Sequence, residues 1–184
     1  MTDLTPITAL GARDARSLTI GSYSLRENSA LALASLSVPD TAPQPFGLTL
    51  PEPGQLTRAG QYGAFWTGPN QWMVEGADLA ETDFARALLA EAPEARVTEQ
   101  TDGWTAFEIR AETSAQITAL LERLANLPAS DLAPGRATRT SFEHMSLFFL
   151  RRSDTELALI GMRTLATTLW HGLETTLERL ETTS

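Results

Sequence analysis

Two alternating apolar segments between Gly63 and Glu75 meet at a Gly-Pro-Asn sequence, with a tryptophan on each side of the junction. Gly68 can adopt positive φ, Pro69 fixes φ near the value required at the second position of a turn, and Asn70 tolerates the left-handed region. The chain is therefore predicted to reverse here as a β-hairpin. This reversal constrains the fold more than any other stretch.

The chain has 184 residues, of which 42% are hydrophobic, and can bury a sizeable core. This size suits a single domain over 1–184, or two small halves at about 1–92 and 93–184 that share one core. The formal net charge of −9 argues against nucleic acid as a partner, because phosphate binding needs a concentrated basic patch. All 14 basic residues are arginines, which suit carboxylate pairing at interfaces, although codon bias alone would give the same composition.

Several classes of site have no signature in the sequence. No cysteine is present, which excludes disulfides, thiolate nucleophiles and Cys-ligated zinc. The two histidines, His144 and His171, show no metal-ligand spacing, and the glycines form neither a dinucleotide nor a phosphate loop. Residues 1–7 lack the pattern of a secretory leader, and no apolar run approaches the ~20 residues that span a bilayer. We expect a cytoplasmic protein that does not span a membrane. We also expect it to bind no metal and no cofactor of its own.

Periodicity in the first third predicts strands at 18–25 and 30–38, joined around 26–29. Five prolines between Pro39 and Pro53 predict a surface crossing, anchored by Phe46 and Leu48.

A helix is predicted after the tryptophan hairpin. Asp78 with Glu81 three residues later resembles a helix amino terminus, Phe84 and Leu88 share one face, and the helix should end before Pro93.

A second hairpin is predicted from 97–100 and 104–110, turning at the Asp-Gly dipeptide of 102–103. A helix follows with a capping box at 113–116. Its apolar face would consist of Ile117, Leu120, Leu121 and Leu124.

The last third predicts strands at 138–145, 147–152 and 157–162, followed by a closing helix. The helix is striped by Leu165, Leu169, Leu173, Leu177 and Leu180. Strand pairs alternating with single helices predict an α+β two-layer sandwich, with helices on one face of a mainly antiparallel sheet and two ferredoxin-like halves.

Neither histidine is predicted to be catalytic. Glu143 and His144 fall in a predicted strand, where neighbouring side chains point to opposite faces, so they cannot act as a local base and its orienter. His144 is interpreted as structural or interfacial. His171 follows Trp170 on the closing helix and is expected to face solvent or a partner.

Aromatic and arginine clusters are the candidate binding features. Trp66 and Trp72 lie six residues apart on the hairpin and are expected on one face, as an interface patch or as core; core is favoured for Trp104. A cluster of positive charge would receive a partner's carboxylates or a folate glutamate tail, or would be a solvated strand end. It consists of Arg136, Arg139, Arg151 and Arg152.

The order and spacing of several segments resemble the gamma subunit of heterotetrameric sarcosine oxidase. The resemblance covers most of the chain and is weakest in the first fifty residues. The segments are Gly68-Pro69-x-x-Trp72, Asp102-Gly103-Trp104, Leu120-Leu121-Glu122-Arg123-Leu124, Pro134-Gly135-x-Ala137-x-Arg139-Thr140, Glu143-His144-Met145 and Leu169-Trp170-His171. The resemblance implies a fold related to the folate-binding aminomethyltransferase of the glycine cleavage system.

The same resemblance implies a noncatalytic small subunit of a flavoenzyme that oxidatively demethylates sarcosine to glycine, forms peroxide and transfers the one-carbon unit to tetrahydrofolate. FAD, FMN, NAD and tetrahydrofolate would be held by the partners, which are larger alpha and beta flavoprotein subunits and a delta subunit. The candidate partner interface comprises Trp66, Trp72, Arg136, Arg139, His144, Arg151 and Arg152. The alternative is a free-standing module that binds folate or a small acid, with a pocket near Arg139 or the tryptophan hairpin.

Overall fold

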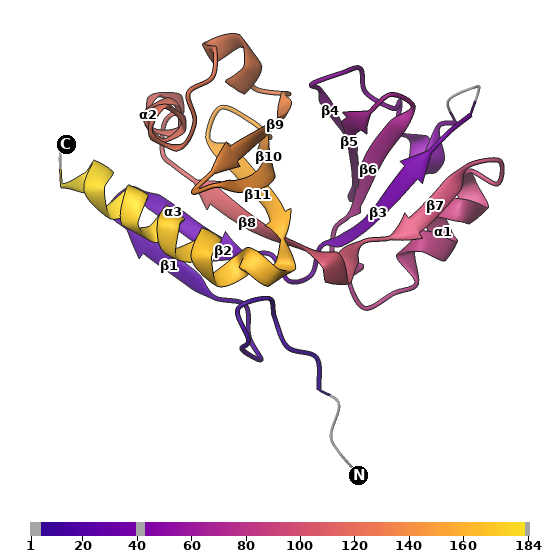
Figure 1. The fold of residues 1–184 in the computed structure, drawn as a ribbon, viewed down its shortest axis with the longest axis horizontal. Coiled ribbons are helices and arrows are strands. Elements are labelled where there is room, and N and C mark those ends of the chain that lie inside the picture. Colours follow the sequence, from indigo (N-terminus) through magenta and orange to yellow (C-terminus); the bar gives the residue numbers. More distant parts are fainter. Residues whose placement is uncertain (1–4, 40–42, 183–184) are drawn as a thin grey trace.

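The computed structural model describes residues 5–39 and 43–182, so parts of the amino-terminal segment 1–7 and of the proline-rich crossing lie outside the described residues. The described chain forms two sheets and three α-helices (Figure 1). Every strand pair in both sheets is antiparallel.

The first sheet, here the large sheet, has six strands in the order β1-β2-β8-β11-β10-β9. Their bounds are β1 Ser17–Ile20, β2 Tyr23–Glu27, β8 Trp104–Arg110, β9 Ala137–Phe142, β10 Met145–Arg151 and β11 Glu156–Met162. Helices α2 (Ser114–Leu124) and α3 (Ala166–Glu181) pack on one face of it through a shared hydrophobic cluster.

The second sheet, here the small sheet, has five strands in the order β4-β5-β6-β3-β7. Their bounds are β3 Ala32–Ser37, β4 Leu56–Ala59, β5 Tyr62–Gly68, β6 Gln71–Gly76 and β7 Arg96–Glu99. Helix α1 (Phe84–Glu91) covers its outer face through Phe84 and Leu88.

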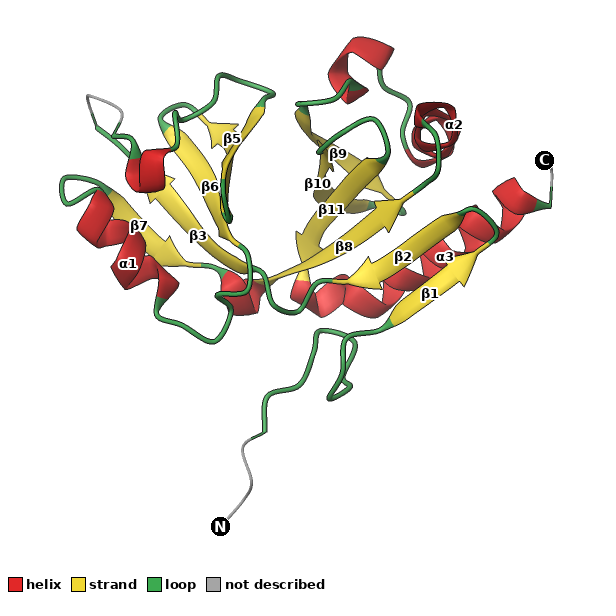
Figure 2. Ribbon diagram, turned by 180° about the vertical axis from the view of Figure 1, so that it is seen from behind, coloured by secondary structure: helices red, strands yellow, loops and turns green. Residues whose placement is uncertain are grey.

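The two sheets pack against each other through the faces that the helices leave free (Figure 2). Phe65 of the small sheet and Phe148 of the large sheet meet with ring centroids 5.0 Å apart. An isolated bridge between Gln55 and Arg136 also connects the two halves of the structure. The layers are therefore helix, sheet, sheet, helix, which confirms the α+β class with antiparallel sheets and helices on one face of each.

The large sheet is built from two separate parts of the chain. Strands β1 and β2 belong to it, β3 to β7 form the small sheet, and β8 to β11 return to the large sheet. The large sheet thus combines the beginning and the end of the chain, and the division into contiguous halves stays a prediction.

Several local predictions are confirmed. Strands β5 and β6 form the expected hairpin, although the positive φ of its turn falls on Asn70 (φ 55°) rather than on Gly68. In α2, Thr113 and Gln116 form the predicted capping box. In the proline-rich crossing, Leu48 is buried and the Phe46 ring stacks on Tyr62.

The prediction of a single strand at 18–25 is wrong. Residues 18–25 themselves contain a turn, and β1 pairs with β2 as a hairpin, with Ile20 opposite Tyr23. Strand β3 lies in the other sheet. Periodicity marked these residues as extended but carried no information about which strand each would pair with.

Two further local signals were misread. The amino-terminal cap of α1 is Asp83, which accepts a hydrogen bond from the Arg86 backbone N–H, whereas Asp78 sits in a turn at φ 58°. The Asp-Gly dipeptide at 102–103 does not join a hairpin, because β7 and β8 belong to different sheets. Those residues form a short 3₁₀ turn, Thr101–Gly103, at the crossing between the sheets.

Candidate functional site

A buried ion pair joins the two sheets. Arg152 follows β10 of the large sheet, and Glu75 lies on β6 of the small sheet, 77 residues away. The guanidinium donates from Nη1 to Oε2 at 2.9 Å and from Nη2 to Oε1 at 2.8 Å. The two side chains are only 7% and 5% exposed, so this two-point contact is shielded from water.

Glycine makes room for this pair. A Cβ on Gly63, which is opposite Glu75 in the hairpin, would lie 2.8 Å from Glu75 Oε2. Any larger residue at this position would push the carboxylate away from Arg152.

A second carboxylate, Glu108 on β8, completes the network. It accepts hydrogen bonds from Asn28 Nδ2 at 2.7 Å and from Arg26 Nη2 at 3.3 Å. Burial acts to raise the pKa of Glu108, but the Asn28 hydrogen bond and the charges of Arg152 and Arg26 outweigh it and leave the pKa below its ordinary value.

Arg152 remains a cation in this network. Burial acts to lower its pKa, and the opposing effects of Glu75, Glu108 and Glu156 are larger, so its pKa lies above the ordinary value. Its Nε is buried without a hydrogen-bond partner in the described part of the chain.

A cavity of about 200 Å³ opens beside the ion pair, between the two sheets. Its charged lining is balanced, with Arg26, Arg58, Arg110 and Arg152 facing Glu75, Asp78, Glu108 and Glu156. Among the described residues that line it there is no Ser, Thr, Tyr or His, so its polar groups are guanidinium, carboxylate and amide groups. The arrangement suits electrostatic fixing of the two sheets.

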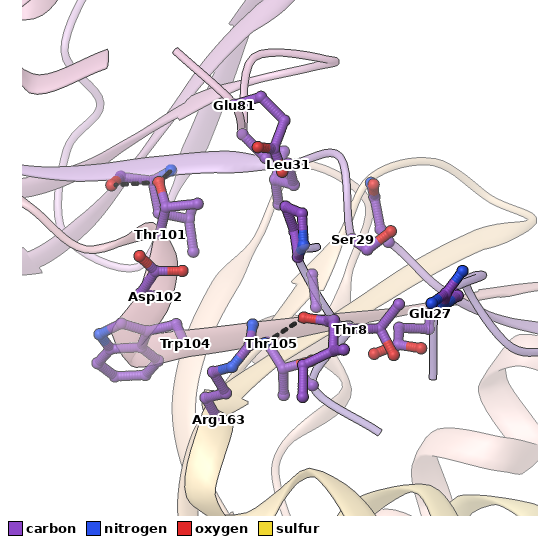
Figure 3. A pocket seen from close by; sticks show the side chains of 18 residues that line it. Thr8, Glu27, Ser29, Leu31, Glu81, Thr101, Asp102, Trp104, Thr105 and Arg163 are labelled. Atoms are coloured by element: carbon purple, nitrogen blue, oxygen red, sulfur yellow. Dashed lines mark hydrogen bonds between the residues drawn. The ribbon is translucent and has the colours of Figure 1, made fainter. Parts of the chain in front are cut away.

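Asn28 and Leu31, in the segment that connects β2 to β3, also line a second, smaller cavity of about 150 Å³. In Figure 3, Glu27 lies on one side of it and Trp104 with Asp102 on the other. Glu27 is 1% exposed and accepts hydrogen bonds from the backbone N–H groups of Leu10 and Arg16. It therefore ties the amino-terminal segment to the large sheet.

The two hairpin tryptophans are brought together, as predicted. Trp66 and Trp72 are directly opposite each other on β5 and β6, on the face of the small sheet that carries α1, and both are half-buried. Trp72 packs against the α1 core and donates from Nε1 to the Pro51 carbonyl at 2.8 Å. Trp104 packs against Phe148, 6.0 Å between ring centroids, at the edge of the inter-sheet core.

The prediction that Glu143 and His144 lie within a strand is wrong. They form the two-residue turn between β9 and β10, both exposed, with φ of 49° and 64°. Two successive positive φ values are typical of a type I′ hairpin turn, in which Asn-Gly is the usual sequence. No such turn signal is present at Glu143 and His144. His171 is exposed on α3, as predicted.

The structure divides the predicted arginine cluster. Arg139 is exposed and its guanidinium lies 5.9 Å from the Phe148 ring, and Arg136 is half-buried, 3.9 Å from Asp131. Arg151 and Arg152 are neighbours whose side chains enter opposite sides of the large sheet, where both are engaged inside the chain. Alternation along a strand separates consecutive side chains in this way.

Sequence reasoning missed Glu75, Glu108 and Asn28. One signal was available for Glu75, which lies two residues after the buried Met73 and therefore in phase with the inner face of β6. In the described residues, no group of three or more His, Cys, Asp or Glu side chains could hold a metal ion. No helix formed by those residues is long and apolar enough to cross a membrane.

Fold and site together define an α+β protein built on two face-to-face antiparallel sheets, with a buried charge network between them. No family model matches the sequence, and no curated protein matches it. Solved structures do match. A chain of the heterotetrameric sarcosine oxidase from Corynebacterium sp. U-96, in complex with pyrrole 2-carboxylate, aligns over 88% of this chain and 87% of its own length, with 14% identity and a TM-score of 0.70.

The glycine cleavage system aminomethyltransferase T from Bartonella henselae aligns over 80% of this chain, with 16% identity and a TM-score of 0.56. This chain spans only 44% of that protein's length. At these identities the likeness shows a shared fold, and the fold expected from the sequence resemblance is confirmed.

Proposed function

We propose that this chain is a noncatalytic small subunit, of the gamma type, in a flavoenzyme complex related to heterotetrameric sarcosine oxidase. The observation that carries the proposal is the extent of the structural match, which covers 88% of this chain and 87% of the sarcosine oxidase chain. The two chains therefore have nearly equal lengths and correspond almost end to end. The aminomethyltransferase match, in contrast, covers 44% of the larger protein, as a part would.

The chemistry of the inter-sheet cavity supports a subunit without its own active site. Its four arginines and four carboxylates are balanced in charge, and the most buried pair, Arg152 and Glu75, is already satisfied by two hydrogen bonds. A catalytic site needs a reactive group that remains free to meet a substrate. Under this proposal, FAD, FMN, NAD and tetrahydrofolate are held by the alpha, beta and delta subunits, and the complex demethylates sarcosine to glycine with peroxide formation.

The partner surface we propose comprises residues of the β9–β10 hairpin and the tryptophans of the β5–β6 hairpin. Arg139 and His144 are exposed, and Trp66 and Trp72 are half-buried. Arginine and tryptophan are both residue types that recur at interface hot spots. Arg136 adds a half-buried guanidinium near the isolated bridge.

The test is affinity purification of the tagged chain from its native cells, followed by mass spectrometry and an absorbance spectrum. We expect a yellow complex with two or more larger flavoprotein subunits. A matched pair of variants sharpens the test: Arg139→Glu with His144→Glu should reduce recovery of the partners, while Arg86→Glu on the exposed face of α1 should not. A colourless, partner-free monomer would contradict the proposal and favour a free-standing binding module.

A further inference from the structure

Arg151 is a buried cation that the charge network between the sheets does not use. Its residue is 4% exposed, and its side chain points to the helix-covered side of the large sheet, toward the start of α2. Nε donates to the Ser153 carbonyl at 2.8 Å, and Nη2 donates to the Asp154 carbonyl at 2.8 Å and to Ser114 Oγ at 3.1 Å. Three hydrogen bonds thus fix the guanidinium plane.

No carboxylate in the described residues lies within ion-pair distance of Arg151. The Asp154 carboxylate is reached only through Ser114, whose hydroxyl donates to Asp154 Oδ1 at 3.2 Å. Burial lowers the pKa of Arg151, and the charge of Asp154 only partly offsets this effect. The positive charge is therefore incompletely compensated from within the described chain.

One nitrogen of Arg151 remains available. Nη1 has no hydrogen-bond partner in the described residues, and it is not among their buried, unpartnered polar atoms. Nη1 is therefore accessible from open space. Arg151 lines a cavity of about 410 Å³ between α2 and the segment 125–134 that follows it.

The wall of this cavity is mixed, and more apolar than polar. Its apolar part is formed by Leu121, Ala125, Leu127, Ala129, Leu132, Ala133 and Pro134. Its polar part is formed by Ser114, Thr118, Glu122, Asn126 and Arg151, of which Arg151 contributes a positive charge. A volume of this size lies within the range of small-molecule sites, roughly 300–1,000 Å³. A fixed guanidinium with a free N–H, set in a wall that is more apolar than polar, is complementary to an anion that carries an apolar body.

We propose that the cavity beside α2 binds a small monocarboxylic acid with a short apolar body, whose carboxylate accepts a hydrogen bond from Arg151 Nη1. The apolar body lies against Leu121 and Leu132. A carboxylate supplies the negative charge that the buried guanidinium lacks, and a neutral or cationic ligand does not. The site lies on the opposite face of the large sheet from the Arg152–Glu75 pair, so it is separate from the inter-sheet cavity.

Glu122 modulates this site. It is exposed and lines the same cavity, so its negative charge repels an incoming carboxylate. Because it is exposed, replacing it should leave the fold intact. Glu112, exposed just before α2 and not among the residues that line the cavity, provides a matched control for the loss of one negative charge.

The test is isothermal titration calorimetry of the purified full-length chain with hexanoate and with its neutral analogue hexanamide. We expect hexanoate to bind at least about tenfold more tightly, the size of a hydrogen bond to a charged group. Glu122→Gln should tighten hexanoate binding by about threefold, the size of an exposed charge interaction. The control Glu112→Gln should bind hexanoate with the same affinity as the wild type. Equal affinity for the two probes overturns the proposal. So does the absence of hexanoate binding at about 10 mM.

Two further variants locate the site. Arg151→Met should abolish the preference for hexanoate over hexanamide. Ala133→Phe, which fills the cavity and keeps the guanidinium, should abolish binding of both. If Arg151→Met does not fold, Ala133→Phe and Glu122→Gln still decide the outcome, and unchanged hexanoate binding in both overturns the assignment of the site. These results do not depend on whether the chain assembles with flavoprotein subunits.

Discussion

The guanidinium of Arg152 and the carboxylate of Glu75 face each other in a two-point ion pair, with N–O distances of 2.8 and 2.9 Å, across the interface between the two sheets. The residues come from strands that are far apart in sequence, and the pair joins the two layers in one orientation. A buried pair of this kind contributes specificity more than net stability, but removing one partner leaves the other charge unsatisfied.

We therefore expect Glu75→Gln to lower the free energy of unfolding by about 3–5 kcal/mol. The double variant Glu75→Leu with Arg152→Met should recover most of this loss, because neither charge remains buried. Chemical denaturation measures both effects. The control is Arg110→Met in the exposed pair with Glu156, 3.0 Å long, where we expect a change within about 1 kcal/mol. Equal effects in the buried and exposed pairs would contradict this account.

Glu108 should make stability depend on acid. Its folded pKa lies below the ordinary value of 4.5, so the unfolded chain takes up a proton at higher pH than the folded protein. Its contribution is fully present above about pH 5 and is lost as the pH falls through the folded pKa. Glu108→Gln should be less stable than the wild type at pH 7, and the difference should shrink below about pH 4. Parallel profiles of unfolding free energy against pH would refute this prediction.

The two hairpin tryptophans should differ in their contribution to stability. Trp72 packs on the α1 core and donates a hydrogen bond to Pro51, while Trp66 does not belong to that cluster. We expect Trp72→Ala to lower the free energy of unfolding by about 2–4 kcal/mol and Trp66→Ala by about 1 kcal/mol. If Trp66 contacts a partner, its replacement should reduce co-purification far more than stability. A large loss of stability in Trp66→Ala would instead place that ring in the core.

The turn at Glu143 and His144 carries backbone strain that can be relieved. Replacing the pair by Asn-Gly should raise the free energy of unfolding by about 1 kcal/mol, because both positions have positive φ. Thermal and chemical denaturation measure the gain. The control is His171→Gly, in the interior of α3, which should lower stability by about 1 kcal/mol. A loss of stability in the Asn-Gly variant would show that the two side chains are needed where they are.

Local signals were read correctly where neighbours in sequence decide the structure. The reversal at Pro69 and Asn70, the capping box of α2 and the leucine stripe of α3 each depend on residues within a few positions of one another. The Asp-Gly dipeptide at 102–103 shows the limit of this reasoning. It has the residues of a hairpin turn, yet the flanking strands pair in different sheets, so tertiary context overrode the local preference.

The sequence by itself determined many of the elements and their faces, because turn geometry, capping and apolar periodicity act over a few residues. It also determined the α+β class, since strand pairs and single helices alternate along the chain. Only the tertiary structure decided which strands share a sheet, and so it alone brought Arg152 to Glu75 and left Arg151 facing the cavity beside α2. Pairing between distant strands depends on the packing of whole layers, and no local pattern encodes it.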